Sequence, residues 1–311
     1  MAKKISCLGS FVVDLTCRVD RLPLPGESLI TDYFKMGPGG KGSNQAVAAR
    51  RAGGNIVLMA KVGQDLLSRV GLDNFRKEGF DEKFIVIDKE VFTGVALINV
   101  DKNTSENSIV VAPGACEHIL DEDIALLKPE IENSDIFLTQ LEVNIDAIEK
   151  AVQIAYDNKK VIVFNTAPVR EISDDLLSKT TIITPNEVEA SILTKVEISD
   201  KSSARKAARV FFDKGITNVV ITLGKKGAYL NDGKIEEIIE PVEVPTIDTT
   251  GAGDAFTGGL VVALAEEKSL LNAVKFATCT AALSTTKMGT APSMPYRKEI
   301  DELVKKAYGS L

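Results

Sequence analysis

A chain of 311 residues is long enough for one large domain or two of medium size. Its composition, 44% hydrophobic and 26% charged, excludes a disordered chain, a collagen-like fibre and a disulfide-rich miniprotein. The 44 acidic residues outnumber the 37 basic ones, and the net charge of −7 argues against a nucleic-acid partner, which would need a basic surface.

Short runs rich in β-branched residues alternate with helical patterns along most of the chain. Runs of this kind, bounded by Gly, Pro or polar turns, are typical of buried parallel strands. We expect strands at residues 4–10, 55–63, 135–140, 160–166, 181–185 and 218–224. Helical patterns cover 43–52, 65–79, 145–158, 186–193, 202–215, 252–265, 269–285 and 296–308, while 227–230 and 234–239 fit an antiparallel edge. The alternation predicts an α/β fold with a doubly wound, mostly parallel sheet.

Two segments break this rhythm, residues 12–35 and 92–112. They combine alternating sequences such as TGVALINV with turn residues at Pro23, Pro25 and Gly26. We expect them to form a small second β-sheet, inserted after the first and third parallel strands. Such a sheet would act as a lid over the carboxyl edge of the main sheet, where α/β folds bind ligands.

The cysteines form no CxxC pair, so the sequence carries neither a zinc site nor a redox motif; they are Cys7, Cys17, Cys116 and Cys279. We expect free thiols in a reducing, cytoplasmic environment. No apolar run approaches the roughly 20 residues that cross a bilayer, and no signal-peptide pattern is present, so we expect no membrane partner. The single histidine, His118, excludes sites that need several histidines, and we expect it in a surface loop without a role.

The segment IDTTGAGDAF, residues 247–256, leads directly into an apolar helical run. The small residues Gly251, Ala252 and Gly253 leave consecutive backbone amides uncovered at a helix start, which suits phosphate oxygens and developing negative charge. Asp254 would sit beside the transferred group as a base toward a hydroxyl. The alternative is that Asp254 caps a helix and the glycines make a turn. A dinucleotide-binding fingerprint fits poorly, because it belongs after the first strand and needs a third glycine.

A second glycine-rich segment, GPGGKGSNQAVAARRAGG, begins at Gly37 and also precedes a helix. It places Lys41 and Asn44 among glycines, and backbone amides together with an amide side chain are groups that hold sugar hydroxyls. Gly42 and Ser43 follow Lys41, so the segment lacks the GKS or GKT ending of a P-loop and argues against nucleotide binding of that type.

These motifs stand in the order of a known family. The chain resembles the ribokinase-like carbohydrate kinases (the PfkB family) from end to end, through GGKGSNQA, TPNEVE and DTTGAGDAF. PGES, TGVALINV, TQLE, NTAPVREI, ITLGKKG and MGTAPSMP are also in register. The resemblance implies one kinase domain over residues 1–311, with the lid in 12–35 and 92–112. It also implies transfer of the γ-phosphoryl group of ATP to the terminal (5-) hydroxyl of a pentose, D-ribose foremost.

The resemblance assigns roles to individual residues. Asp254 is implied as the catalytic base and as a sugar contact, while the amides of Gly251, Ala252 and Gly253 hold the oxyanion charge. The other implied sugar ligands are Asp14, Gly40, Lys41, Gly42, Asn44 and Glu142. Asp14 as a lid turn residue and Glu142 as a solvated helix cap are the alternatives.

Nucleotide and Mg²⁺ contacts are implied in the same way. Asn186 and Glu189 lie three residues apart, hence on one face of a short helix, and in the family this face meets the ATP phosphates and the waters of Mg²⁺. An ordinary helix cap is the alternative. The implied ATP contacts also include Gly253 and the segment TLGKKG with Thr222, Gly224, Lys225 and Gly227. Thr278 stands at the adenine-facing position, although a buried helical threonine is an equally good interpretation.

A monovalent cation, usually K⁺, often lies next to the anion hole in this family. The positions that match its ligands are Asp248, Thr250, Ser284, Lys287, Gly289 and Ser293. Most would contribute backbone oxygens, which any residue can supply, so Asp248 is the one informative side chain.

One departure concerns the substrate. Bacterial ribose-specific members usually have Asn two residues before the sugar-binding Asp, whereas this chain has Val12. Deoxyribose kinases are also apolar at this place, so deoxyribose is an alternative to ribose, and other sugars or nucleosides are weaker ones. A silent sugar- or nucleotide-sensing protein is the alternative from another class. We further expect a homodimer, because exposed lid strand edges favour pairing with a second subunit.

Overall fold

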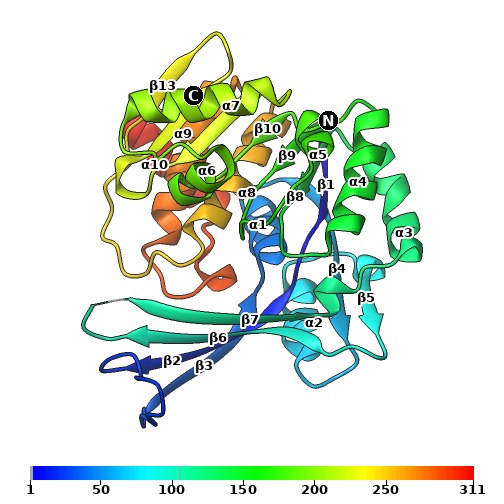
Figure 1. The fold of residues 1–311 in the computed structure, drawn as a ribbon, viewed down its shortest axis with the longest axis vertical. Helices are drawn as coiled ribbons and strands as arrows, with labels where there is room; N and C mark the ends of the chain where they lie inside the picture. Colours follow the sequence, from blue (N-terminus) through cyan, green and yellow to red (C-terminus); the bar gives the residue numbers. More distant parts are fainter. Residues whose placement is uncertain (1–2, 105) are drawn as a thin grey trace.

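The computed structural model describes residues 3–104 and 106–311. Met1, Ala2 and Ser105, which fall within the predicted domain and lid ranges, lie outside the described residues. In the described ranges the strands form a nine-stranded sheet, in the order β13-β12-β11-β10-β9-β8-β1-β4-β5, and a separate four-stranded sheet, in the order β3-β2-β6-β7 (Figure 1).

Short apolar strands form the centre of the larger sheet. The parallel strands are β1 (Lys4–Leu8), β4 (Asn55–Gly63), β5 (Ile85–Asp88), β8 (Ile136–Thr139), β9 (Val161–Phe164), β10 (Ile182–Ile183) and β11 (Asn218–Thr222). Two antiparallel strands, β12 (Ala228–Asn231) and β13 (Glu236–Ile239), complete one edge. Strands such as β8 are buried along their whole length because helices cover both faces.

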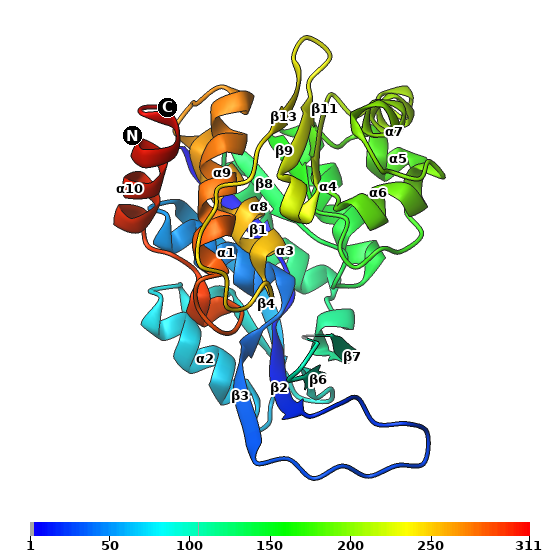
Figure 2. The same cartoon turned by 90° about the vertical axis from the view of Figure 1, so that its left-hand side faces the viewer.

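Helices pack on both faces of this sheet, as Figure 2 shows. One face is covered by α1 (Lys41–Arg51), α2 (Ser68–Lys77), α8 (Ala252–Ala265), α9 (Leu270–Ser284) and α10 (Arg297–Tyr308). The other is covered by α3 (Asp121–Glu132), α4 (Ile145–Asp157), α5 (Asp174–Ser178), α6 (Glu187–Thr194) and α7 (Lys201–Asp213). Two hydrophobic cores result, one on each side of the sheet. The predicted doubly wound α/β fold is confirmed.

The smaller sheet extends from the main body of the molecule (Figure 1). It consists of β2 (Val12–Val19), β3 (Tyr33–Gly39), β6 (Thr93–Asp101) and β7 (Asn107–Gly114). Strand β2 follows β1, and β6 follows β5, so the insertions come after the first and third parallel strands in chain order. The strands differ from the expected ranges: residues 20–32, which the structure describes throughout, contain no strand, and β3 continues to Gly39.

Some elements were missed by the sequence patterns. Strand β5 has only four residues, and α3 carries Pro129 in its interior, which weakens a helical pattern. Helix α5 is also short, and α2 begins at Ser68 rather than at residue 65. Short 3₁₀ turns complete the described chain: η1 (Glu82–Phe84), η2 (Ala115–Glu117), η3 (Gly224–Lys226) and η4 (Ala291–Ser293).

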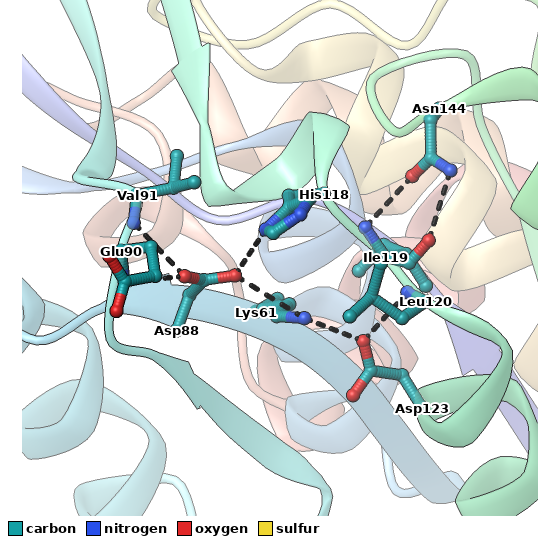
Figure 3. Close-up of polar contacts among 9 residues, drawn as sticks. All are labelled: Lys61, Asp88, Glu90, Val91, His118, Ile119, Leu120, Asp123 and Asn144. Atoms are coloured by element: carbon teal, nitrogen blue, oxygen red, sulfur yellow. Dashed lines mark hydrogen bonds and ion pairs between the residues drawn. The ribbon is translucent and has the colours of Figure 1, made fainter.

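A buried cluster of charged side chains connects the start of α3 with the segment through which the chain enters the smaller sheet (Figure 3). Lys61 on β4 is 2.7 Å from Asp123 Oδ2 and 3.4 Å from Asp88 Oδ2, and these side chains are 4–5% exposed. Asp123 also accepts a hydrogen bond from the backbone amide of Leu120 at 2.8 Å. Because Asp88 ends β5 shortly before β6 begins, the cluster anchors the connection between the two sheets.

His118 lies in a loop, as expected, and also contacts this cluster. Its ring is partly exposed, but Nδ1 is hydrogen-bonded to the buried carboxylate of Asp88. Burial acts to raise the pKa of Asp88, but the amides of Glu90 and Val91 and the ring of His118 hold that pKa well below its usual range.

The cysteines are unpaired, as expected, and Cys7 and Cys279 are buried in β1 and α9. Within the described ranges, every helix is too short or too polar to cross a bilayer.

Candidate active site

Asp254 lies in the first turn of α8 and is 7% exposed. The residue before the helix, Gly251, has a φ of 79°, a conformation that favours glycine and turns the chain so that the next amides are uncovered. Two neighbouring side chains of α1 hold the carboxylate: Asn44 Nδ2 donates to Oδ2 at 2.9 Å, and Gln45 Nε2 donates to Oδ1 at 3.0 Å. Both oxygens of the predicted base are therefore fixed in place.

A chain of buried amides continues behind this pair. Gln140 Nε2 donates to Gln45 Oε1 at 2.8 Å, and Gln45 Nε2 also donates to Asn165 Oδ1 at 3.1 Å. Asn165 in turn donates to the carbonyl of Thr184 at 2.6 Å. Sequence analysis missed these residues, although a glutamine directly before the small apolar run at residues 46–49 of α1 indicates a buried polar contact.

Glu142 follows β8 and faces the start of α1. Its Oε2 accepts from the backbone amide of Lys41 at 2.8 Å and from the hydroxyl of Ser10 at 2.6 Å. Gly40 is the N-cap of α1, and the amide of Gly42 donates to Ser10 Oγ at 3.3 Å. The structure thus places Glu142 next to the glycine-rich segment that leads into α1.

Asn44 has one unused polar atom. Its Oδ1 is buried and, in the described part of the chain, has no hydrogen-bond partner. Because a buried acceptor without a partner is costly, the atom is matched to a group that a ligand would bring, such as a hydroxyl.

Asp14 lies on β2, and its Oδ2 accepts a hydrogen bond from Thr290 Oγ1 at 3.0 Å. Burial raises the pKa of Asp14 to about 6, the negative charges of Glu142 and Asp254 add to the shift, and Thr290 and Lys41 oppose it. Asp14 is thus close enough to Lys41, Glu142 and Asp254 for their charges to shift its pKa.

Beside Asp254 lies a cavity of about 200 Å³. It joins the start of α8 to the start of α6 and the end of β11, as its lining residues are Lys41, Asn165, Ala167, Thr184, Asn186, Glu189, Thr222, Thr249, Gly251, Ala252, Gly253, Asp254 and Thr257. The predicted catalytic residues therefore share one cavity with four of the predicted nucleotide and Mg²⁺ residues, namely Asn186, Glu189, Thr222 and Gly253. Asn165, Thr184, Thr249 and Thr257 are lining residues that sequence analysis missed.

Asn186 and Glu189 cap α6 reciprocally. Asn186 Oδ1 accepts from the amide of Glu189 at 2.8 Å, while Glu189 accepts from the backbone amide and the side-chain amide of Asn186 at 3.0 and 2.8 Å. The capping alternative is thus realised, and both residues still line the cavity. Burial raises the pKa of Glu189 despite the bond from Asn186 and the charge of Lys41.

Lys41 is a positively charged side chain among the carboxylates of the site. Burial acts to lower its pKa, but the carboxylates of Asp254, Glu142, Glu189 and Asp14 outweigh that effect, and the net shift is upward. Burial also raises the pKa of Asp254, while Lys41, Gln45 and Asn44 oppose the shift. A carboxylate with a raised pKa is a stronger base, which suits proton transfer from a hydroxyl.

The remaining predicted nucleotide residues lie outside this cavity. Gly224 and Lys225 are exposed in η3, and Gly227 follows them with a φ of 85°. Thr278 is buried on α9, where its hydroxyl donates to the carbonyl of Val274 at 2.9 Å. That bond is the one expected of a buried helical threonine.

The predicted cation ligands come from two segments that meet beside Gly251. Asp248 Oδ1 accepts from the hydroxyl of Thr250 at 2.7 Å, and Asp248 Oδ2 accepts from the amide of Gly289 at 2.9 Å. Ser293 bonds to the carbonyl of Thr290. Ser284 bonds to a carbonyl of its own helix, and the Lys287 side chain pairs with Glu299. The described residues contain no cluster of three His, Cys, Asp or Glu residues suited to a metal.

The chain is similar to known carbohydrate kinases over its whole length. A family model described as pfkB family carbohydrate kinase matches residues 2–297. A ribokinase of Haemophilus influenzae is 44% identical over 307 residues, which cover 99% of this chain and 100% of that protein. A deoxyribokinase of Salmonella typhimurium is 33% identical, covering 96% of this chain and 97% of its own.

A solved structure gives the same result. The structure of Arabidopsis thaliana ribokinase complexed with ribose and ATP has a TM-score of 0.88 to this chain at 27% identity, and the match covers 98% of this chain and 99% of that one. The chain therefore belongs to the pfkB family of carbohydrate kinases.

Proposed function

We propose that the chain phosphorylates the 5-hydroxyl of D-ribose at the expense of ATP. The observation that carries this proposal is the buried carboxylate of Asp254, held through both oxygens by Asn44 and Gln45 at the N-terminus of α8. A general base beside uncovered amides is the arrangement that phosphoryl transfer to an alcohol requires.

In the proposed reaction the sugar oxygen forms a new bond to the γ-phosphorus as the bond from that phosphorus to ADP breaks. The hydroxyl proton passes to the carboxylate of Asp254. The amides of Gly251, Ala252 and Gly253 donate to the oxygens on which negative charge increases. Proton acceptance and charge stabilisation suffice, because this chemistry depends mainly on positioning.

The cavity residues fit a nucleotide phosphate. A side chain built on Gly253 would meet open space, so phosphate oxygens have room to approach its amide. Glu189 already accepts two hydrogen bonds from Asn186, so it would hold the waters of Mg²⁺ rather than the ion itself. Mg²⁺ supplies charge neutralisation on the phosphates when it is bound. Thr222 lines the same cavity, while Gly224, Lys225, Gly227 and Thr278 are proposed contacts for the outer part of the nucleotide.

Sugar hydroxyls are proposed to bind on the other side of Asp254. Asp14 and Glu142 accept from hydroxyls, and the unpartnered Oδ1 of Asn44 provides a third acceptor in the described structure. The backbone of Gly40 and Gly42 and the side chain of Lys41 complete the proposed contacts. The four-stranded sheet, with β2 carrying Asp14, would act as the lid over this sugar.

A monovalent cation is proposed between residues 248–250 and 284–293. The oxygens available there are carbonyls and the remaining lone pairs of Asp248, whose carboxylate already organises both segments. K⁺ accepts such a ligand set, and a positive charge beside Gly251 would favour the anionic transition state.

The lid sheet is also the proposed dimer surface. It exposes large apolar side chains, among them Phe34, Met36, Leu97, Val110 and Val111 at 43–65%. Apolar residues on open strands favour association with a second copy. Light scattering at micromolar concentration should give twice the monomer mass, and a monomer would exclude the dimer. A reducing cytoplasm suits the four unpaired cysteines.

The second candidate substrate is 2-deoxy-D-ribose. Val12 is 3% exposed and packs against Gly94 on the lid, so no donor is available at that position for a ring hydroxyl. A hydroxyl left without a partner in a dry site costs about 1–3 kcal/mol. Ribose remains the first choice, since Asp14, Asn44 and Glu142 supply acceptors independently of Val12.

The experiment is a coupled ADP-release assay with Mg²⁺-ATP and D-ribose, 2-deoxy-D-ribose, fructose or adenosine, each with and without K⁺. The proposal requires the highest kcat/KM for ribose. A preference for deoxyribose would retain the kinase mechanism and assign specificity to Val12. Absence of turnover with all four would contradict the proposal.

A further inference from the structure

Thr290 connects two distant parts of the chain. It lies between α9 and α10, and its hydroxyl oxygen is 3.0 Å from Asp14 Oδ2 and 2.9 Å from the carbonyl oxygen of Pro38. Asp14 lies near the start of β2 and Pro38 near the end of β3, so one side chain contacts both lid strands at what we call the lid root, where the two strands join the main body. The residue is 8% exposed.

The backbone of Thr290 is held from the other side. Its carbonyl accepts from the amide and the hydroxyl of Ser293 at 3.0 and 2.8 Å. The preceding residue, Gly289, donates to Asp248. A Cβ at Gly251 would lie 3.3 Å from Thr290 Cα, so the start of α8 packs directly against it. Figure 2 shows this orange-red segment beside β3, with which η4 is in contact.

The Asp14 carboxylate is confined on one side by the backbone of Gly39. A Cβ at Gly39 would lie only 2.2 Å from Asp14 Oδ1, so the carboxylate occupies the space that glycine leaves open. A hydroxyl has a single hydrogen and donates to one acceptor at a time, and an ionised carboxylate is a stronger acceptor than a carbonyl. With Asp14 ionised, the hydroxyl of Thr290 therefore donates to Oδ2, and Oδ1 accepts no hydrogen bond within the described residues and remains available to a ligand.

We propose that Thr290 is a positioning residue that fixes the carboxylate of Asp14 for sugar binding and ties the lid root to the loop after α9. The proposal rests on the proposed function, because it takes Asp14 as a sugar ligand. Thr290 has no hydrogen bond to Asp254 in the described structure, so its contribution falls on sugar affinity and not on the proton transfer.

The test compares Thr290→Val, which keeps the shape of the side chain without its hydroxyl, with Thr290→Ser, which keeps the hydroxyl. A hydrogen bond to a charged group is worth enough to raise the ribose KM roughly tenfold when it is removed. We expect that rise in Thr290→Val with kcat within about twofold of the parent, and a ribose KM close to the parent in Thr290→Ser.

Thr180→Val is the matched control. Thr180 is 2% exposed, and its hydroxyl donates only to the carbonyl of Leu176, at 3.1 Å. It measures the general cost of replacing a buried hydroxyl, and its ribose KM should equal that of the parent. Melting temperatures of all variants identify any loss of folded protein.

Each outcome has a separate meaning. An unchanged ribose KM in Thr290→Val overturns the inference while an active parent leaves the proposed function intact. An equal rise in Thr290→Ser, or a fall in kcat alone, overturns it as well, because the hydroxyl is then not the group that positions Asp14. A parent without activity on any sugar contradicts the proposed function instead.

Discussion

The side-chain amide of Gln45 donates a hydrogen bond to Oδ1 of Asp254 at 3.0 Å, and the same amide nitrogen lies 3.1 Å from Asn165 Oδ1. Gln45 is fully buried and is itself held by Gln140. The proposed base is thus aligned by a residue that does not need to touch the sugar. Asn44, which holds the other carboxylate oxygen of Asp254, is the residue shared with the proposed sugar site.

Replacing Gln45 tests this alignment. Gln45→Leu removes the donor to Asp254 while nearly conserving volume, and the loss of a hydrogen bond to a charged group predicts a kcat lowered about 10- to 100-fold. The ribose KM should change less than kcat. Steady-state kinetics with saturating ATP measure both.

Gln153→Leu provides the matched control, because Gln153 also donates to an aspartate, Asp157, at 2.7 Å, but on the outer surface of α4. Its kcat should equal that of the parent. Equal effects of the two substitutions on kcat would show that Gln45 has no special role.

The decrease of ribose affinity at low pH should reflect protonation of Asp14. Burial raises the pKa of this carboxyl to about 6, and only its ionised form accepts fully from sugar hydroxyls. Ribose affinity should therefore fall as pH decreases through about 6, well above the ordinary carboxyl pKa of about 4. Calorimetric titration with ribose from about pH 5 to about pH 8 measures it.

Asp14→Asn should bind ribose more weakly, and its ribose affinity should no longer fall near pH 6, since an amide does not titrate there. The groups around it, Lys41, Glu142 and Asp254, remain in that variant. A fall in affinity near pH 6 that persists in Asp14→Asn would be assigned to one of them.

Removal of Asp248 should disable the cation site. Asp248→Ala deletes the carboxylate that holds Thr250 and Gly289. We expect K⁺ to raise the turnover of the parent and to have little effect on this variant, as measured by ADP release across a KCl series with constant ionic strength. A parent that is equally active in choline chloride would contradict the proposed K⁺ site.

The buried cluster in Figure 3 should matter for stability rather than catalysis. Lys61→Met leaves Asp88 and Asp123 buried without their cation, which predicts a loss of about 3–5 kcal/mol in the free energy of unfolding. Lys128→Met removes a half-exposed pair with Glu132 and should cost less than about 1 kcal/mol. Urea denaturation compares the two, and equal midpoints would contradict this account.

The fold could be predicted where the local signal is strong. Helix α8 occupies the predicted range 252–265, because a glycine-rich start and a continuous apolar run mark both of its ends. The helix α3 was missed, although three acids in its first turn were a usable signal, because Pro129 interrupts the pattern. The strand β5 is too short to stand out from a buried turn.

The site was predictable only in part for a related reason. Motifs named the glycine loops and Asp254, since their residues are close in sequence. The contact between Thr290 and Asp14 joins positions 276 residues apart, and no local pattern announces it. Gln45 stands inside a recognised motif, but only the packing of α1 against α8 shows which atom it holds.

The most direct test of the central claim is Asp254→Asn, measured by ADP release with ribose and by calorimetric ribose binding. The amide keeps the size of the side chain, and Asn44, whose Oδ1 has no partner among the described residues, can turn to accept from it. We predict a kcat lower by a factor of about 10² to 10⁴ with ribose affinity retained within about tenfold. A variant that turns over ribose within tenfold of the parent would show that Asp254 is not the base.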